Sequence, residues 1–152
     1  MIDERLQELG IVLSPVFPPA GNYLGCVIDD GLVQVSGHGP VNGDTIIRGK
    51  VGAELTLEQG REAARLTALS ILATLRAELG DLDRIARIVK VFGMVNVAPG
   101  FTQTPAVIDG CSDLLVAVFG AAGRHARSAV GLAELPIGIA VEIELTARLR
   151  PA

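Results

Sequence analysis

Apolar and polar side chains alternate in Ile139-Ala140-Val141-Glu142-Ile143-Glu144-Leu145-Thr146-Ala147-Arg148-Leu149, and this is the clearest structural pattern in the sequence. Successive side chains of a β-strand point to opposite faces of a sheet, so the alternation predicts a strand over 139–149 with one buried face. Glu142 and Glu144 lie on the other face, about 7 Å apart. One of two crowded carboxyl groups can have a raised pKa and act as a general base, although most such pairs lie on a solvated strand face.

Upstream of this strand, helical spacing predicts elements that could cover its apolar face. Thr56 and Gln59 form a capping box, and Gly80 follows the last apolar residue of a periodic run, which predicts a helix over 57–79. Residues 3–9 are expected to form a short amphipathic helix.

A second long helix is predicted to start at Thr104 as N-cap, with Pro105 at the first helical position, and to end at Gly120. Its buried row is expected to consist of Val107, Cys111, Leu114 and Val118.

The remaining elements are predicted to be strands and loops. An Asp29-Asp30-Gly31 turn joins strands at 26–28 and 32–36, and glycine-rich residues 37–52 are expected to be loops. Further strands are expected at 85–97, apolar on both faces, and at 126–133. The order is β-β-α-β-α-β-β, an α+β fold in which two helices cover one face of a mixed sheet. Residues 1–152 are expected to form a single domain.

The amino-acid composition argues against some classes of function. Apolar residues make up 49% of the 152 residues, and 17 acidic against 13 basic residues give a net charge of −4. This balance argues against a nucleic-acid binder, which needs a basic face, and few aromatic residues are present for base stacking. The mean hydropathy of +0.46 is high for a soluble monomer, so part of the surface, including the open sheet face, is expected to be buried against other subunits.

Cellular location is also suggested by the sequence. Cys26 and Cys111 form no disulfide or metal-binding pattern, the N-terminus lacks a signal peptide, and no apolar run approaches the ~20 residues of a membrane helix. We therefore expect a cytoplasmic protein with no membrane partner.

Three further motifs are better explained by structure than by a catalytic or binding role. Residues 37–43 have the spacing GxGxxxG without a following helix, which favours a loop over a nucleotide site. His38 and His125 lie on different predicted elements, and surface positions are the simpler interpretation of both. Asp81 and Asp83 are expected in a helix-to-strand turn rather than in a calcium loop.

Arg127 is the basic residue with the most potential. It shares a strand face with Ala129 and Gly131, whose small side chains leave space in which a guanidinium could bind a carboxylate. An ordinary salt bridge, to Glu142 or Glu144, is an equally good interpretation.

Two sets of residues resemble the signatures of the YjgF/RidA family of reactive intermediate deaminases. The C-terminal set consists of Arg127-Ser128-Ala129-Val130, Leu135-Pro136 and Val141-Glu142-Ile143-Glu144, and the N-terminal set of Tyr23 and residues 33–40. The context of Tyr23 and residues 123–131 is most similar to the longer, chorismate-mutase-like branch, and other family members are labelled endoribonucleases.

The resemblance implies a homotrimer with clefts between subunits, in which 2-imino acids are hydrolysed to 2-keto acids and ammonia without a metal or organic cofactor. It implies that Arg127 holds the substrate carboxylate and that Glu142 orients or activates water. Tyr23, Ser36 and Gly37 would line the cleft.

The chain departs from the family pattern at two positions. Ala129 replaces a cysteine found in many of the deaminases, and Ser112 or Asp109 replaces an asparagine of the cleft. Non-catalytic binding of small carboxylic acids is therefore the alternative to deamination. RNA cleavage and chorismate rearrangement are weaker alternatives, because the chain is acidic and Arg127 is the only cation placed near the cleft.

Overall fold

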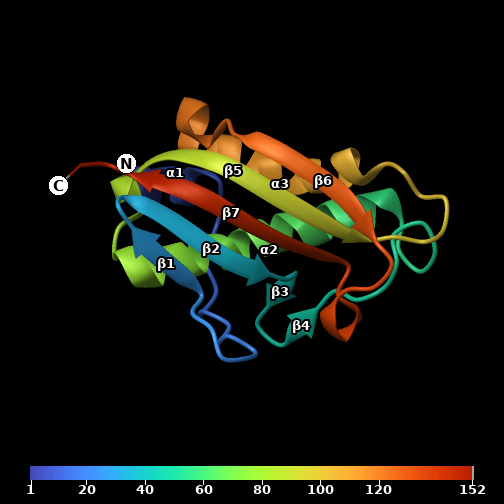
Figure 1. The fold of residues 1–152 in the computed structure, drawn as a ribbon. Coiled ribbons are helices and arrows are strands. Elements are labelled where there is room, and N and C mark those ends of the chain that lie inside the picture. Colours follow the sequence, from blue (N-terminus) through green and yellow to red (C-terminus); the bar gives the residue numbers. More distant parts are fainter. Residues whose placement is uncertain (152) are drawn as a thin grey trace.

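A five-stranded mixed sheet, in the order β1-β2-β7-β5-β6, forms the centre of the structure, a computed structural model that describes residues 1–151. The strands are β1 (Cys26–Asp29), β2 (Leu32–His38), β5 (Ile85–Asn96), β6 (Ala126–Leu132) and β7 (Val141–Leu149). β5 and β6 run parallel, and the other neighbours are antiparallel. The helices α2 (Leu57–Leu79) and α3 (Thr104–Phe119) lie side by side on one face and leave the other open (Figure 1). The predicted α+β fold is confirmed.

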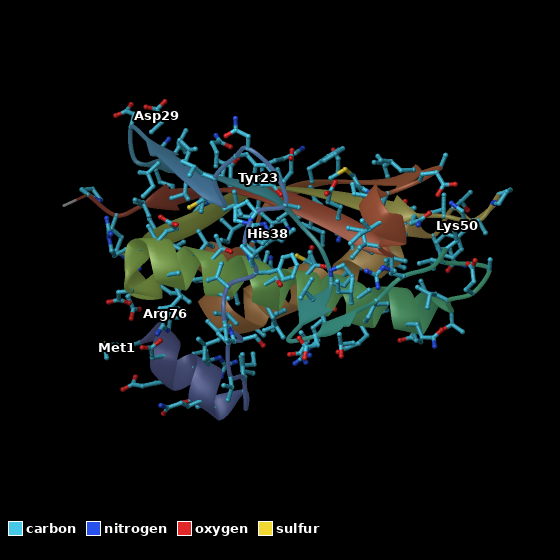
Figure 2. The ribbon with its side chains drawn as sticks, turned by 90° about the horizontal axis from the view of Figure 1, so that it is seen from below. Met1, Tyr23, Asp29, His38, Lys50 and Arg76 are labelled. Atoms are coloured by element: carbon cyan, nitrogen blue, oxygen red, sulfur yellow. The ribbon has the colours of Figure 1, made fainter. Side chains whose placement is uncertain are left out.

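The helix predicted over 57–79 is confirmed as α2, because both ends carry the expected signals. The Thr56 hydroxyl accepts a hydrogen bond from the Gln59 amide at 3.2 Å, and the Gln59 side chain accepts one from the Thr56 amide at 2.8 Å. Gly80 ends the helix with a φ of 77°. The short N-terminal helix is also present, as α1 (Ile2–Glu8), beside Arg76 of α2 (Figure 2). Asp3 of α1 pairs with Arg76.

The start of the second helix differs from the prediction. Thr104 is the first residue of α3 rather than its N-cap, and its hydroxyl donates to the Ala129 carbonyl of β6 at 3.1 Å. The hydroxyl therefore ties the helix to the edge strand, a contact that local sequence cannot show. The predicted buried row is confirmed.

α3 also corrects the expectation about long apolar segments. Thr104–Gly123 has a mean hydropathy of 1.6 over its best window and is long enough to span a membrane, by length and composition only. Seven residues of α3 itself are buried against the domain's own core, as in the core helix of a globular protein.

The N-terminal hairpin is confirmed, with Asp30 at φ 45° and Gly31 at φ 73° in its turn. Residues 37–52 are not wholly loops, since β3 (Val41–Asn42) and β4 (Thr45–Ile46) form a small second sheet beside β2. The two strands are too short to produce a detectable alternation in the sequence. Asp81 caps the single 3₁₀ turn Leu82–Arg84 before β5, as expected for a connection.

The open sheet face is mixed in character. Phe92 and Met94 of β5 are half-buried, and Val27 and Val130 are exposed. β5 is thus less apolar on its second face than predicted, since Lys90 also lies there beside Gln34 and Thr146.

Candidate functional site

A hollow of about 640 Å³ lies between the proline-rich N-terminal segment, the end of β2 and the start of β7. Tyr23, Ser36, Gly37 and Glu142, all predicted site residues, line it together. The Tyr23 hydroxyl accepts a hydrogen bond from the Ala20 amide at 3.2 Å, which closes a local turn in the N-terminal segment.

Glu142 enters the hollow because Gly37 faces it without a side chain. A Cβ atom at Gly37 would lie 3.0 Å from the Glu142 carboxyl carbon. Burial, and then the neighbouring Glu144, raise the pKa of Glu142. The predicted asymmetry of the two carboxyl groups is supported, and Glu142 is the group suited to take a proton.

His38 lies between the sheet and α2, beside the hollow (Figure 2). A shift in register between Val35 and His38 turns its ring towards α2. Nδ1 lies 2.6 Å from the Ser36 carbonyl, so it donates, and Nε2 then accepts from the Thr74 hydroxyl at 2.8 Å. Burial lowers the pKa of His38. His125 lies beyond two further strands, so the two histidines form no acid–base pair.

Apolar side chains form much of the wall of the hollow, and the sequence analysis did not find them. They are Phe17, Pro18, Ile46, Ile137 and Ile139. Phe17 and Ile137 are exposed despite their size, with 52% and 69% of their surface accessible. Large apolar residues within a proline-rich surface segment were the available signal.

Arg127 lies elsewhere, at the β6 edge of the sheet beside α3. Its Nη1 donates to Asp109 at 2.7 Å and to the Ser112 hydroxyl at 3.0 Å, and its Nη2 donates to the Pro105 carbonyl at 3.3 Å. The expected salt-bridge partner, Glu142 or Glu144, is therefore wrong, and Asp109 is the partner. Ala129 lies two residues after Arg127 in β6 and on the same face of the strand.

The strand register explains why Arg127 and Glu142 do not meet within one chain. Val91 of β5 pairs with both Arg127 and the buried Leu145, so Arg127 is on the helix-covered face. Met94 pairs with Glu142, on the open face. The predicted site is thus divided into the hollow, with Glu142, and an edge site consisting of Asp109, Ser112, His125, Arg127 and Ala129.

These features define a class of protein: a small α+β domain with two helices on one face of a mixed sheet, an open second face, and a glutamate and an arginine on opposite faces. The family described as "YjgF/chorismate_mutase-like, putative endoribonuclease" matches residues 3–149. The chain belongs to this YjgF/L-PSP family, as its resemblance predicted.

Individual relatives agree over nearly the whole chain. Protein TCP17 of Trypanosoma cruzi is 45% identical over 147 residues, covering 95% of this chain and 92% of the relative. The solved structure of Atu1372 from Agrobacterium tumefaciens, described as of unknown function, is 39% identical with a TM-score of 0.88 over 97% of this chain and 91% of that one. A "putative endoribonuclease" from Shewanella oneidensis is 33% identical, with a TM-score of 0.95 over 98% and 99% of the two chains.

Proposed function

We propose that the protein hydrolyses 2-imino acids, or the enamines that tautomerise to them, to 2-keto acids and ammonia. The observation that carries this proposal is the division of a carboxylate-binding arginine and a carboxyl group of raised pKa between opposite sheet faces. The reaction needs both groups, so the site is completed when the edge site of one copy lies against the hollow of another, in a homotrimer.

Arg127 is suited to hold the substrate carboxylate because α3 orients it without using all of its donors. Nη1 and Nη2 contact α3, whereas Nε has no hydrogen-bond partner within residues 1–151. Nε–H and one Nη2–H point in parallel, which is the geometry for binding both oxygens of a carboxylate. The side chain remains 21% exposed, so this edge of the guanidinium can be reached.

Glu142 is suited to activate the water. Its carboxylate would take a proton from the water as the oxygen attacks the imine carbon, which gives a carbinolamine. For an imine that binds protonated, return of that proton to the nitrogen makes ammonia the leaving group, and the carbinolamine hydroxyl passes its proton to Glu142 as the carbonyl forms. Partial burial, which raises the pKa of Glu142, makes its carboxylate a stronger base than an exposed glutamate. The apolar wall, with Phe17 and Ile137, provides contact area for the substrate's side chain.

The character of the open sheet face supports the proposal that copies of the chain associate through it. Half-buried Phe92 and Met94 and exposed Val27 and Val130 form apolar surface beside polar groups, as at subunit interfaces. A neighbouring copy on this face would bring its β6 edge near the hollow.

The test is release of 2-keto acids from imino acids generated by an amino-acid oxidase. Wild type should accelerate release, and Arg127→Ala and Glu142→Gln should each lower the rate on the order of 10²-fold. Arg65→Ala and Glu62→Gln are matched controls, since these two residues form an exposed pair on α2. Failure of the wild type to accelerate release for any side chain would refute the deaminase.

Non-catalytic binding of small carboxylic acids is the second candidate. It is favoured by Ala129, which replaces the cysteine of many family deaminases, and by Asp109, which already pairs with Arg127. Binding of 2-keto acids that is lost in Arg127→Ala, without turnover of any imine, would establish this function instead.

A further inference from the structure

We propose that Ser112 and His125 form a nucleophile–base dyad that is acylated by short esters carrying a second, anionic group. This activity is separate from imine hydrolysis and depends on residues within one chain. Ser112 lies in the middle of α3, and His125 lies just before β6, so packing of the helix against the edge strand brings them together.

Hydrogen-bond geometry fixes the direction of the proton. His125 Nδ1 lies 2.6 Å from the Gly123 carbonyl oxygen, which can only accept, so Nδ1 carries the hydrogen. In the neutral ring Nε2 is then an acceptor. Ser112 Oγ lies 2.9 Å from Nε2 and therefore donates to it. This is the arrangement of an activated serine: a nucleophile bonded to a base that a third group orients.

Arg127 adds a positive charge at the serine oxygen. Its Nη1 donates to Ser112 Oγ at 3.0 Å while also pairing with Asp109. The serine oxygen thus accepts from a guanidinium and donates to an imidazole. A neighbouring cation favours the alkoxide that forms when the proton moves to His125.

The dyad is accessible, and two arginines lie in the hollow around it. Ser112, His125 and Arg127 line a hollow of about 360 Å³ together with Arg124 and Val116. A second hollow, of about 440 Å³, also contains Arg124 and His125 and adds Arg87. The Arg124 side chain has no hydrogen-bond partner within the described part of the chain. Asp109 offsets the charge of Arg127, so Arg124, which lines the serine's hollow without an acidic partner within residues 1–151, is the group that favours an acyl donor with a negative charge.

The step balances without a further reactant. Ser112 Oγ forms a bond to the acyl carbon, its proton passes to His125 Nε2, and the leaving alcohol takes that proton as its bond to the acyl group breaks. Water then hydrolyses the acyl-serine. With an alkyl fluorophosphonate, Oγ bonds to phosphorus and fluoride leaves, so the serine remains labelled.

The full-length protein is therefore treated with a fluorophosphonate, and the adduct is located by mass spectrometry. The label is expected on Ser112, to be absent in Ser112→Ala, and to form on the order of 10²-fold more slowly in His125→Gln. Ser128→Ala is the matched control, because Ser128 lies nearby on β6 and contacts Lys90 rather than a histidine. No label, a label on another serine, or an equal rate in His125→Gln would overturn the dyad.

Two further experiments test the role of His125 in a cysteine variant and the preference for an anionic substrate. Ser112→Cys should be alkylated by iodoacetamide faster than the double variant Ser112→Cys, His125→Gln. Equal rates would overturn the role of His125. This comparison does not depend on an alanine variant. The succinate half-ester of 4-nitrophenol should be cleaved about fivefold faster than the acetate, and Arg124→Ala should remove this preference. No preference in the wild type would overturn the anionic class. None of these readouts depends on imine turnover, so each proposal can fail alone.

Discussion

Replacing Asp109 by asparagine should strengthen the binding of carboxylates to Arg127. Asp109 Oδ1 lies 2.7 Å from Nη1, so its negative charge faces any anion held on the other edge of the guanidinium. Asparagine can still accept the hydrogen bond through its side-chain oxygen, while Ser112 and the Pro105 carbonyl continue to orient Arg127. The substitution thus removes a charge and keeps the geometry.

The magnitude follows from the separation of the two anions. A carboxylate on the Nε–Nη2 edge would lie about 7 Å from Asp109, because the guanidinium and two hydrogen bonds separate them. Asp109 is 44% exposed and Arg127 21%, so screening is between that of water and that of a buried site. With an effective dielectric constant of about 40, the repulsion at that distance is about 1 kcal/mol, or roughly fivefold in Kd.

The assay is calorimetric titration with 2-oxobutanoate at low ionic strength. Asp109→Asn should bind about fivefold more tightly than wild type, and added salt should reduce the difference because it screens the repulsion. Asp113→Asn is the matched control, since Asp113 lies on the same helix and pairs with Arg61 at 3.0 Å. Unchanged or weaker binding by Asp109→Asn would refute the electrostatic argument.

Three further predictions concern stability and reactivity. Burial, and then Glu144, raise the pKa of Glu142 above its usual 4.5, so the folded protein holds that proton more tightly than the unfolded chain. The stability this provides is present below pH 4.5 and is lost as pH rises through the raised pKa. In urea titrations, the free energy of unfolding of Glu142→Gln should therefore rise relative to that of wild type over this pH range. A difference between the two proteins that does not change with pH would contradict this. Gly110→Ala would place a Cβ atom 2.1 Å from the Arg61 carbonyl oxygen where α2 and α3 cross, and should lower the free energy of unfolding by about 3 kcal/mol, seen as a lower Tm. An unchanged Tm would be inconsistent with that close crossing. Burial raises the pKa of Cys111 to about 12, so it should react with a disulfide reagent only after unfolding, and rapid reaction of the folded protein would be the contrary result.

The residues of the hollow were named from the family resemblance, and the structure shows where they lie. Tyr23, Ser36, Gly37 and Glu142 meet in one hollow, as the resemblance implied. The partner of Arg127 was not predicted, because strand alternation indicates which residues share a face and does not indicate which helix packs behind them.

The contact between Ser112 and His125 could not be predicted from the sequence either. The two residues are thirteen positions apart, on a helix and in the connection after it, and no periodicity links them. The bond exists because the helix ends in the 3₁₀ turn Gly120–Gly123, whose last carbonyl holds the His125 ring.

Local sequence patterns are sufficient to predict the capped helix α2, the alternating strand β7 and the apolar row of α3. These features depend on interactions between residues a few positions apart, and helical or strand periodicity records them directly. That Arg127 faces α3 while Glu142 faces the open side follows from long-range strand pairing, which no local pattern encodes. That outcome depends on the register in which β5 joins β6 and β7, and a shift of one residue would move each side chain to the other face.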